Sequence, residues 1–161
     1  MGSAALPASA RAQLVGADPA ACSDPEATAL HVHVSGFKNG AGSVRFQAYG
    51  SDPAAFLEKG KWVRRVDVPL AGRSSLDVCL RLPQPGRYAL AVRHDANGSG
   101  KSDWNDGAGF SRNPRLSLFR PKPSFDAVVI AAGRGQTRVP IVMNYRHGLS
   151  IGPEPARSAA D

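Results

Sequence analysis

The chain has 161 residues, enough for one domain with a real hydrophobic core and too few for two. Its 17 Gly and 13 Pro residues favour short strands joined by turns over long helices. The 20 Lys and Arg residues against 13 Asp and Glu give a net charge of +7, which favours anionic partners without naming one. No run of about 18 apolar residues is present, so we expect no membrane span.

Residues 1–27 are rich in Ala, Pro, Asp and Ser without periodicity, and we expect a flexible arm there. Met1-Gly2-Ser3 resembles an expression scar, and Ala8-Ser9-Ala10 resembles a signal-cleavage site without its basic and apolar leader. We therefore expect a periplasmic or secreted protein whose native signal peptide has been removed. The two cysteines, Cys22 and Cys79, favour one disulfide over two free thiols, because small exported domains use such links.

Seven segments alternate apolar and polar residues, as half-buried strands do. The expected strands cover residues 28–35, 43–49, 62–68, 74–82, 87–94, 125–131 and 136–144. Asn39-Gly40, between the first two runs, predicts an antiparallel hairpin. Residues 52–60 predict one short helical turn. Pro140 cannot donate a backbone hydrogen bond, which predicts an edge position for the last strand.

These elements predict one all-β domain over residues 28–147, followed by a flexible tail over residues 148–161. We expect an antiparallel seven-stranded β-sandwich of immunoglobulin-like or transthyretin-like type. Such a domain buries roughly two thirds of its unfolded surface, so its stability should not require a metal. The expected core comprises Val32, Val34, Val44, Phe46, Leu76, Val78, Leu80, Leu90, Val92, Val129, Val139 and Ile141.

The strongest chemical signal is residues 95–106, directly after the strand expected over 87–94. Oxygen ligands fall at positions 1, 3, 5, 9 and 12 of an EF-hand-like calcium loop, with a glycine at position 6. The expected ligands are Asp95, Asn97, Ser99, Lys101 through its carbonyl, Asp103 and Asp106. The alternative is a loop of Asx turns that bond their own backbone, with glycine at positive φ. No helical pattern flanks the loop, so an EF-hand domain is not expected.

Four motifs stand in order along the chain: Pro85-Gly86-Arg87-Tyr88-Ala89, His94-Asp95-Ala96-Asn97-Gly98-Ser99-Gly100-Lys101-Ser102-Asp103, Gly109-Phe110-Ser111 and Pro123-Ser124-Phe125. Together they resemble the signature of the bacterial domain of unknown function 2141. The resemblance is strongest over residues 83–125 and looser over 28–144. It implies an exported β-sandwich, usually made with a signal peptide, and it implies no activity.

One departure from the family pattern concerns the acidic loop. Members usually carry a longer insert with a Pro and a Glu-Gly where this chain has residues 104–108. If that Glu completes an ion site in relatives, Asp106 must substitute for it, or the site is degraded. Trp104 is expected to cover the top of the sandwich instead. The residues expected to be structural in this region are His94, bonding loop backbone beneath Asp95, with Gly98, Gly100, Gly109 and Phe110.

Residues 107–123 contain no acid and hold the clearest basic patch, made by Arg112, Arg115, Arg120 and Lys122. Nucleic acid fits poorly, because no recognisable motif or set of stacking aromatics accompanies the cations. An anionic lipid headgroup or an acidic polysaccharide fits an exported protein better, and a protein partner is a further option. The alternative is a solvated loop in an Arg-rich chain.

Two other groups of residues could carry chemistry. His31 and His33 share a strand face and could bind a transition metal with His94 or His147, but two surface histidines are the favoured interpretation. For catalysis, Gly98-Ser99-Gly100 lacks the strand-turn-helix context of a hydrolase nucleophile. The loop carboxylates lack the aromatics of a sugar cleft. We therefore expect no enzymatic activity.

The sequence thus predicts an exported binding or accessory module. A calcium-organised acidic loop would present the basic loop to an anionic or amphiphilic partner, and calcium is the one cofactor expected. The first alternative is a carrier of a small apolar ligand, such as a lipid or pigment, held in a cavity between the sheets. The second is a hydrolase that uses the loop carboxylates.

Overall fold

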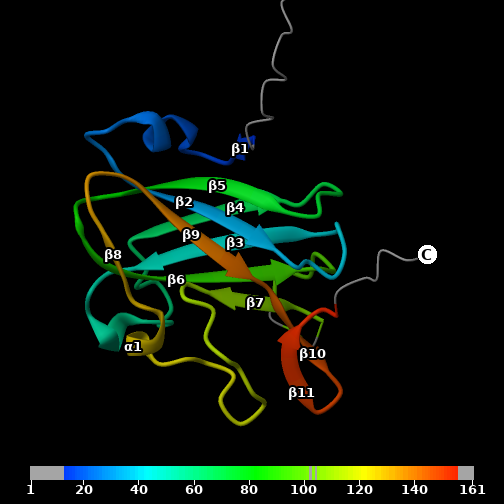
Figure 1. Ribbon diagram of the computed structural model, residues 1–161. Coiled ribbons are helices and arrows are strands. Elements are labelled where there is room, and N and C mark those ends of the chain that lie inside the picture. Colours follow the sequence, from blue (N-terminus) through cyan, green and yellow to red (C-terminus); the bar gives the residue numbers. More distant parts are fainter. Residues whose placement is uncertain (1–12, 102, 104, 156–161) are drawn as a thin grey trace, which may run out of the picture.

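The computed structural model describes residues 13–101, 103 and 105–155, which fold as a two-layer β-sandwich (Figure 1). The four-stranded sheet has the order β1 (Leu14–Val15), β5 (Leu76–Leu82), β2 (Thr28–Ser35) and β9 (Gly135–Val142). The seven-stranded sheet has the order β11 (Ser150–Pro153), β10 (Asn144–His147), β7 (Gly107–Phe110), β6 (Gly86–Asp95), β3 (Ser43–Tyr49) and β4 (Arg64–Pro69), with β8 (Ile130–Ala132) also paired to β6. The all-β prediction is confirmed.

The structure has more strands than the sequence predicted, and not all of them are antiparallel. The described residues form eleven strands rather than seven, and two pairs, β1–β5 and β2–β9, are parallel. The additional strands are two to four residues long, too short for alternation to reveal them. β9 lies at the edge of its sheet, as Pro140 predicted.

The predicted hairpin between residues 28–35 and 43–49 is wrong, although both strands exist. β2 pairs with β5 and β9, whereas β3 pairs with β4 and β6 in the other sheet. The inward residues of both strands belong to one core cluster and are fully buried. Burying both apolar faces against each other requires the chain to cross between the sheets, so the turn at Asn39-Gly40 makes that crossing.

The predicted core is confirmed at every position except Val129, which is half-buried. The strand expected over 125–131 is wrong in its first half. Phe125–Val128 forms the short helix α1, and Val129 ends it. Phe125 and Val128 pack in a second apolar cluster with Tyr49 and Phe110, so a turn of helix buries both side chains on one side.

Both ends of the described chain are more ordered than expected. Pro19–Ser23 forms the 3-10 helix η1, and the Cys22–Cys79 disulfide, with a Cα–Cα distance of 5.9 Å, links it to β5. The predicted disulfide is therefore present. β11 pairs with β10, so residues 150–153 are part of the second sheet rather than a tail. Residues 1–12 and 156–161 of the expected arm and tail lie outside the described residues.

The helices of the described residues are short. The helical turn expected over 52–60 appears as η2 (Pro53–Ala55), where the Asp52 carboxylate accepts the backbone N–H of Ala54 at 3.0 Å. Over residues 13–101, 103 and 105–155, no helix has the length and apolar character needed to cross a membrane.

Candidate ligand-binding site at one end of the sandwich

The acidic loop joins β6 to β7, which pair as neighbouring antiparallel strands with His94 opposite Gly107. Asp95 is buried at its start, and its two carboxylate oxygens accept the backbone N–H groups of Ser99 at 3.1 Å and Gly100 at 2.8 Å. Gly98 and Gly100 have φ of +67° and +75°. The Asn97 side-chain oxygen accepts the Ser99 backbone N–H, two residues further on, at 3.1 Å. The loop therefore contains an Asx-type bond of the alternative interpretation.

Asp103 is the second centre of the acidic loop. Its carboxylate accepts the Asn97 side-chain amide at 2.6 Å, the Asn105 backbone N–H at 2.8 Å and the Ser99 hydroxyl at 3.4 Å. The bond from Asn97, followed by that from Asn105, holds the pKa of Asp103 below its usual value. The Lys101 carbonyl also accepts from the Ser99 hydroxyl, at 2.8 Å. The structure thus gathers these predicted ligand residues into one hydrogen-bonded cluster.

Asp106 differs from the other two carboxylates. One of its oxygens accepts the Asp103 backbone N–H at 3.2 Å, while the other is buried with no hydrogen-bond partner among the described residues. Burial raises the pKa of Asp106, and the nearby charges of Asp103 and Asp95 act in the same direction. The described part of the chain contains no group of three or more His, Cys, Asp or Glu arranged to hold a metal ion. Calcium binding therefore stays a prediction.

A buried histidine supports the base of this loop. His94 is fully buried, and its two ring nitrogens lie 2.7 Å from the Tyr145 hydroxyl and 2.7 Å from the Ala41 carbonyl. Because a carbonyl can only accept, the Nε2–H donates to Ala41 and Nδ1 accepts from Tyr145. The partner differs from the acidic-loop backbone that the sequence suggested. Burial lowers the pKa of His94 and raises the pKa of Tyr145 to about 12.

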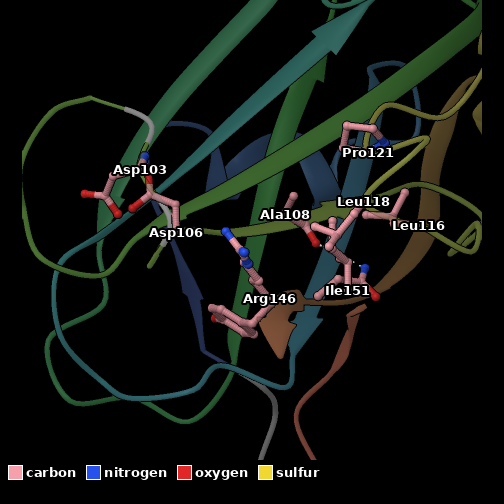
Figure 2. A pocket seen from close by; sticks show the side chains of 10 residues that line it. Asp103, Asp106, Ala108, Leu116, Leu118, Pro121, Arg146 and Ile151 are labelled. Atoms are coloured by element: carbon pink, nitrogen blue, oxygen red, sulfur yellow. Dashed lines mark hydrogen bonds between the residues drawn. The ribbon is translucent and has the colours of Figure 1, made fainter. Parts of the chain in front are cut away.

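Tyr145 also lines a pocket of about 430 Å³ beside the acidic loop (Figure 2). The lining comes from the acidic loop, β7, residues 112–123, β10 and β11, and is mostly apolar. The residues are Asp103, Asp106, Ala108, Leu116, Leu118, Pro121, Asn144, Tyr145, Arg146 and Ile151. Figure 2 shows the two carboxylates at one end, the leucines with Pro121 and Ile151 at the other, and Arg146 between them.

Hydrogen bonds that are buried at Ser111 and exposed at Asn113 anchor the segment that forms the apolar wall. Ser111 is fully buried; its hydroxyl donates to the Val128 carbonyl at 2.6 Å and accepts the Leu90 N–H at 3.1 Å. Two residues later, the Asn113 side chain accepts the Val142 N–H at 2.9 Å and donates to the Pro140 carbonyl at 3.2 Å. Residues 112–123 are therefore tied to β9 at the point where they leave β7.

Two glycines let β7 lie close to its neighbours. A Cβ on Gly107 would stand 2.4 Å from the Tyr145 ring, and one on Gly109 would stand 2.6 Å from Ile141. Phe110 is buried in the second apolar cluster. Gly109 therefore packs against β9, and Phe110 packs against α1, so both have the structural role that the sequence suggested.

The four predicted basic residues lie on the outside of residues 112–123. Arg112 donates to the Asp126 carbonyl at 2.9 Å, while Arg115, Arg120 and Lys122 are exposed. None of the four lines the 430 Å³ pocket. The cation that does is Arg146, on β10, which the sequence analysis missed.

The paired histidines lie on the four-stranded sheet, away from the pocket. His31 Nε2 and His33 Nδ1 contact the same oxygen of Asp77, at 2.8 and 3.1 Å. Burial alone would raise the pKa of Asp77, but the two histidine bonds outweigh it and hold the pKa below its usual value. The proposed third ligands do not meet them, because His94 is in the core and His147 pairs with Glu154 at 3.7 Å.

The sequence analysis found the acidic end of the pocket and missed its other walls. Leu116 and Leu118 lay in a stretch without periodicity, and Tyr145, Arg146 and Ile151 lay at or beyond the last expected strand. One usable signal was Gly148, which has φ +59° in the turn between β10 and β11. A glycine between two short alternating runs is typical of a hairpin.

Comparison with known proteins identifies a family that matches this chain. A family model described as "Uncharacterized protein conserved in bacteria (DUF2141)" matches residues 32–140, which span β2 to β9 and include the acidic loop. No curated protein and no solved structure matches the chain. The resemblance drawn from the four motifs is thereby confirmed.

Proposed function

Because the chain belongs to DUF2141, a family of uncharacterized bacterial proteins, we propose its function from the geometry of its loop end. The protein is an exported, non-enzymatic binding module on an immunoglobulin-like or transthyretin-like framework. It takes one small zwitterionic amphiphile into the pocket between residues 112–123 and β10–β11. The observation that carries this proposal is a hollow of about 430 Å³, apolar at one end and charged at the other (Figure 2). Small-molecule pockets typically occupy roughly 300–1,000 Å³.

The apolar end suits a short hydrocarbon chain. Leu116, Leu118 and Ile151 are half-buried, and each lies on a loop or an edge strand. Part of their apolar surface therefore remains in contact with water in the free protein. A ligand chain laid against them removes apolar surface from water on both sides, at about 25 cal/mol per Å². This wall favours an aliphatic group over a sugar or a nucleotide base.

The charged end suits a head group that carries one positive and one negative charge. Asp103 and Asp106 supply carboxylates and Arg146 supplies a guanidinium group, while the Tyr145 ring is buried and already has the Lys38 ammonium 5.7 Å from its centroid. A quaternary ammonium fits the carboxylates, and a phosphate fits the guanidinium. A phosphocholine-type head presents both groups, so it is the preferred ligand class.

The pocket lies outside the space between the sheets. That space is filled by side chains from both layers, including the fully buried Leu30, Phe46, Leu80 and Leu90. A carried lipid would therefore bind in the pocket beside the acidic loop rather than between the sheets. The Cys22–Cys79 disulfide supports export, since such bonds persist in oxidising compartments.

Calcium binding by the acidic loop is a second proposal. It is supported by the ligand spacing of residues 95–106 and by the buried Asp106 oxygen that has no hydrogen-bond partner among the described residues. A cation beside Asp106 would satisfy that oxygen. It would also neutralise part of the charge at the carboxylate end of the pocket and shift head-group preference towards anions.

Calorimetric titration with decylphosphocholine below its micelle concentration tests the ligand proposal. We expect saturable one-site binding, and weaker binding of decyl maltoside, which has the same tail and an uncharged head. Leu118→Asp should weaken binding roughly tenfold or more, because it puts a charge in the apolar wall. Val63→Asp, which changes an exposed apolar residue away from the pocket, is the matched control. Equal affinity of the two variants, or no saturable binding by the wild type, would refute the proposal.

A further inference from the structure

Two apolar side chains are far more exposed than any other large hydrophobic residue in the described chain. Phe119 is 97% exposed and Leu149 is 88% exposed, against 45% for Val63. Phe119 lies at the tip of residues 112–123, and Leu149 lies in the turn between β10 and β11. Both tips project at the lower end of the molecule in Figure 1. The segments that carry them are neighbours, because Leu118 and Ile151 line the same pocket.

Hydrogen bonds hold each tip in its exposed position. Ser117 and Arg120 exchange two backbone bonds, at 3.2 and 3.1 Å, so Leu118 and Phe119 occupy the centre of a tight turn. Leu118 lines the pocket while Phe119 is exposed to solvent. In the second turn His147 pairs with Ser150, whose hydroxyl donates to the His147 carbonyl at 3.0 Å.

Each apolar tip is carried by a segment that also holds basic residues. Arg115, Arg120 and Lys122 flank Phe119, and within the described chain none of them forms an ion pair. On the second segment, Arg146 and His147 precede Leu149. The nearby acids are Glu154, which pairs with His147, and the loop carboxylates at the opposite end of the pocket from Leu118 (Figure 2).

The geometry points to a membrane-docking surface in which Phe119 and Leu149 enter the interface of an anionic phospholipid bilayer. Exposed apolar side chains on segments that also carry Lys and Arg match the two layers of such a surface, anionic headgroups outside and acyl chains beneath. The net charge of +7 acts in the same direction. The inference goes beyond the proposed function and does not depend on it, although docking would place the apolar wall of the pocket at the lipid surface.

Vesicle co-sedimentation tests this surface. We expect the wild type to bind vesicles of phosphatidylcholine and phosphatidylglycerol in a 7:3 ratio, and to bind pure phosphatidylcholine vesicles far less. The double variant Phe119→Ser, Leu149→Ser should lower the partition coefficient roughly tenfold by removing two inserted apolar side chains. Arg115→Gln with Arg120→Gln should lower it by a similar factor. Val63→Ser and Arg138→Gln are matched controls away from both tips and should bind like the wild type.

A Phe119→Trp variant supplies a second readout. Its emission should be quenched by dibrominated phosphatidylcholine in the 7:3 vesicles more strongly than wild-type emission, because the new indole enters the acyl boundary. The inference is overturned if the wild type does not bind anionic vesicles, or if the tip variants bind these vesicles as well as the wild type does. It is also overturned if the wild type binds an acidic polysaccharide instead, or if the tip variants dissociate a dimer in which the tips cover each other. Decylphosphocholine titration of the tip variants separates loss of docking from loss of the pocket.

Discussion

Two of the buried polar side chains, His94 and Ser111, bond to segments that surround the pocket. His94 joins the β2–β3 connection to β10 through Ala41 and Tyr145, and Ser111 joins β6 to the end of α1 through Leu90 and Val128. Buried polar groups of this kind are costly when a partner is lost. Each of them therefore offers a test of how the loop end is held.

His94 should make stability depend on pH in a defined window. Burial lowers its folded-state pKa below 6.5, so between that lowered value and 6.5 the unfolded chain binds more protons. The contribution of His94 to the free energy of unfolding should be complete above about pH 6.5. It should decrease as the pH drops towards the folded-state pKa. The slope from this group cannot exceed about 1.4 kcal/mol per pH unit.

Urea unfolding of the wild type and His94→Asn between pH 5 and 8 measures this effect. The variant should be less stable and should lose part of the slope. The lowered pKa of Asp77 acts in a separate window, because its contribution is present above its ordinary value of 3.8 and is lost only below that value. An unchanged slope in His94→Asn would contradict the assignment to His94.

Ser111→Ala should destabilise the protein by about 1–3 kcal/mol, since it leaves the Leu90 N–H and the Val128 carbonyl without their buried partner. Denaturant unfolding gives the change. Ser74→Ala, on an exposed side chain, is the control and should change stability by less than about 0.5 kcal/mol. Equal effects of the two substitutions would show that the Ser111 bonds contribute nothing.

At the scale of elements, the long strands were predictable and the short ones were not. The bounds of β2 and β3 match the predicted ranges, because seven or eight residues of strict alternation define a half-buried strand. β7 could not be seen, since only four residues, Gly107–Phe110, pair with β6, and their two glycines carry no hydropathy pattern. The predicted pairing of β2 with β3 was wrong, because alternation defines which face of a strand is buried and not which strand is its neighbour.

Because β7 lies close to β9 and β10, we expect a side chain at Gly109 to destabilise the protein. In Gly109→Ala, the new Cβ would stand 2.6 Å from Ile141 and 3.0 Å from the Met143 sulfur, both in the core. Overpacking of this kind should cost about 1–3 kcal/mol. Gly133→Ala, whose Cβ would meet nothing within 4 Å, is the matched control. Thermal unfolding that leaves the two variants equally stable would show that β7 does not pack as described.

Across the whole molecule, the acidic loop, residues 112–123 and β10–β11 meet around one pocket, and the two exposed tips lie on the last two of these segments. The sequence predicted the acidic end of this site, because ligand spacing is local. It did not predict the apolar wall, because Leu118 and Ile151 meet only when the chain passes from β9 in one sheet to β10 in the other. Contacts made by such a crossover leave no local pattern.

Calcium should raise the thermal midpoint of chelator-treated protein while leaving the apo protein folded, because the core is complete without an ion. At a hundred times the dissociation constant, binding stabilises by about 2.7 kcal/mol, which is roughly 5–10 °C for a domain of this size. Magnesium should give no comparable shift. The shift should vanish in Asp95→Ala, Asp103→Ala and persist in Asp126→Ala. No shift in the wild type would show that the acidic loop does not bind calcium.

Amide chemical-shift mapping with decylphosphocholine locates the ligand on the protein, and so tests whether the pocket beside the acidic loop binds a small amphiphile. We expect saturable shifts concentrated at Ala108, residues 116–121 and residues 144–151, with little change on β2 and β5. Shifts confined to the four-stranded sheet, or spread without saturation over the whole surface, would contradict it.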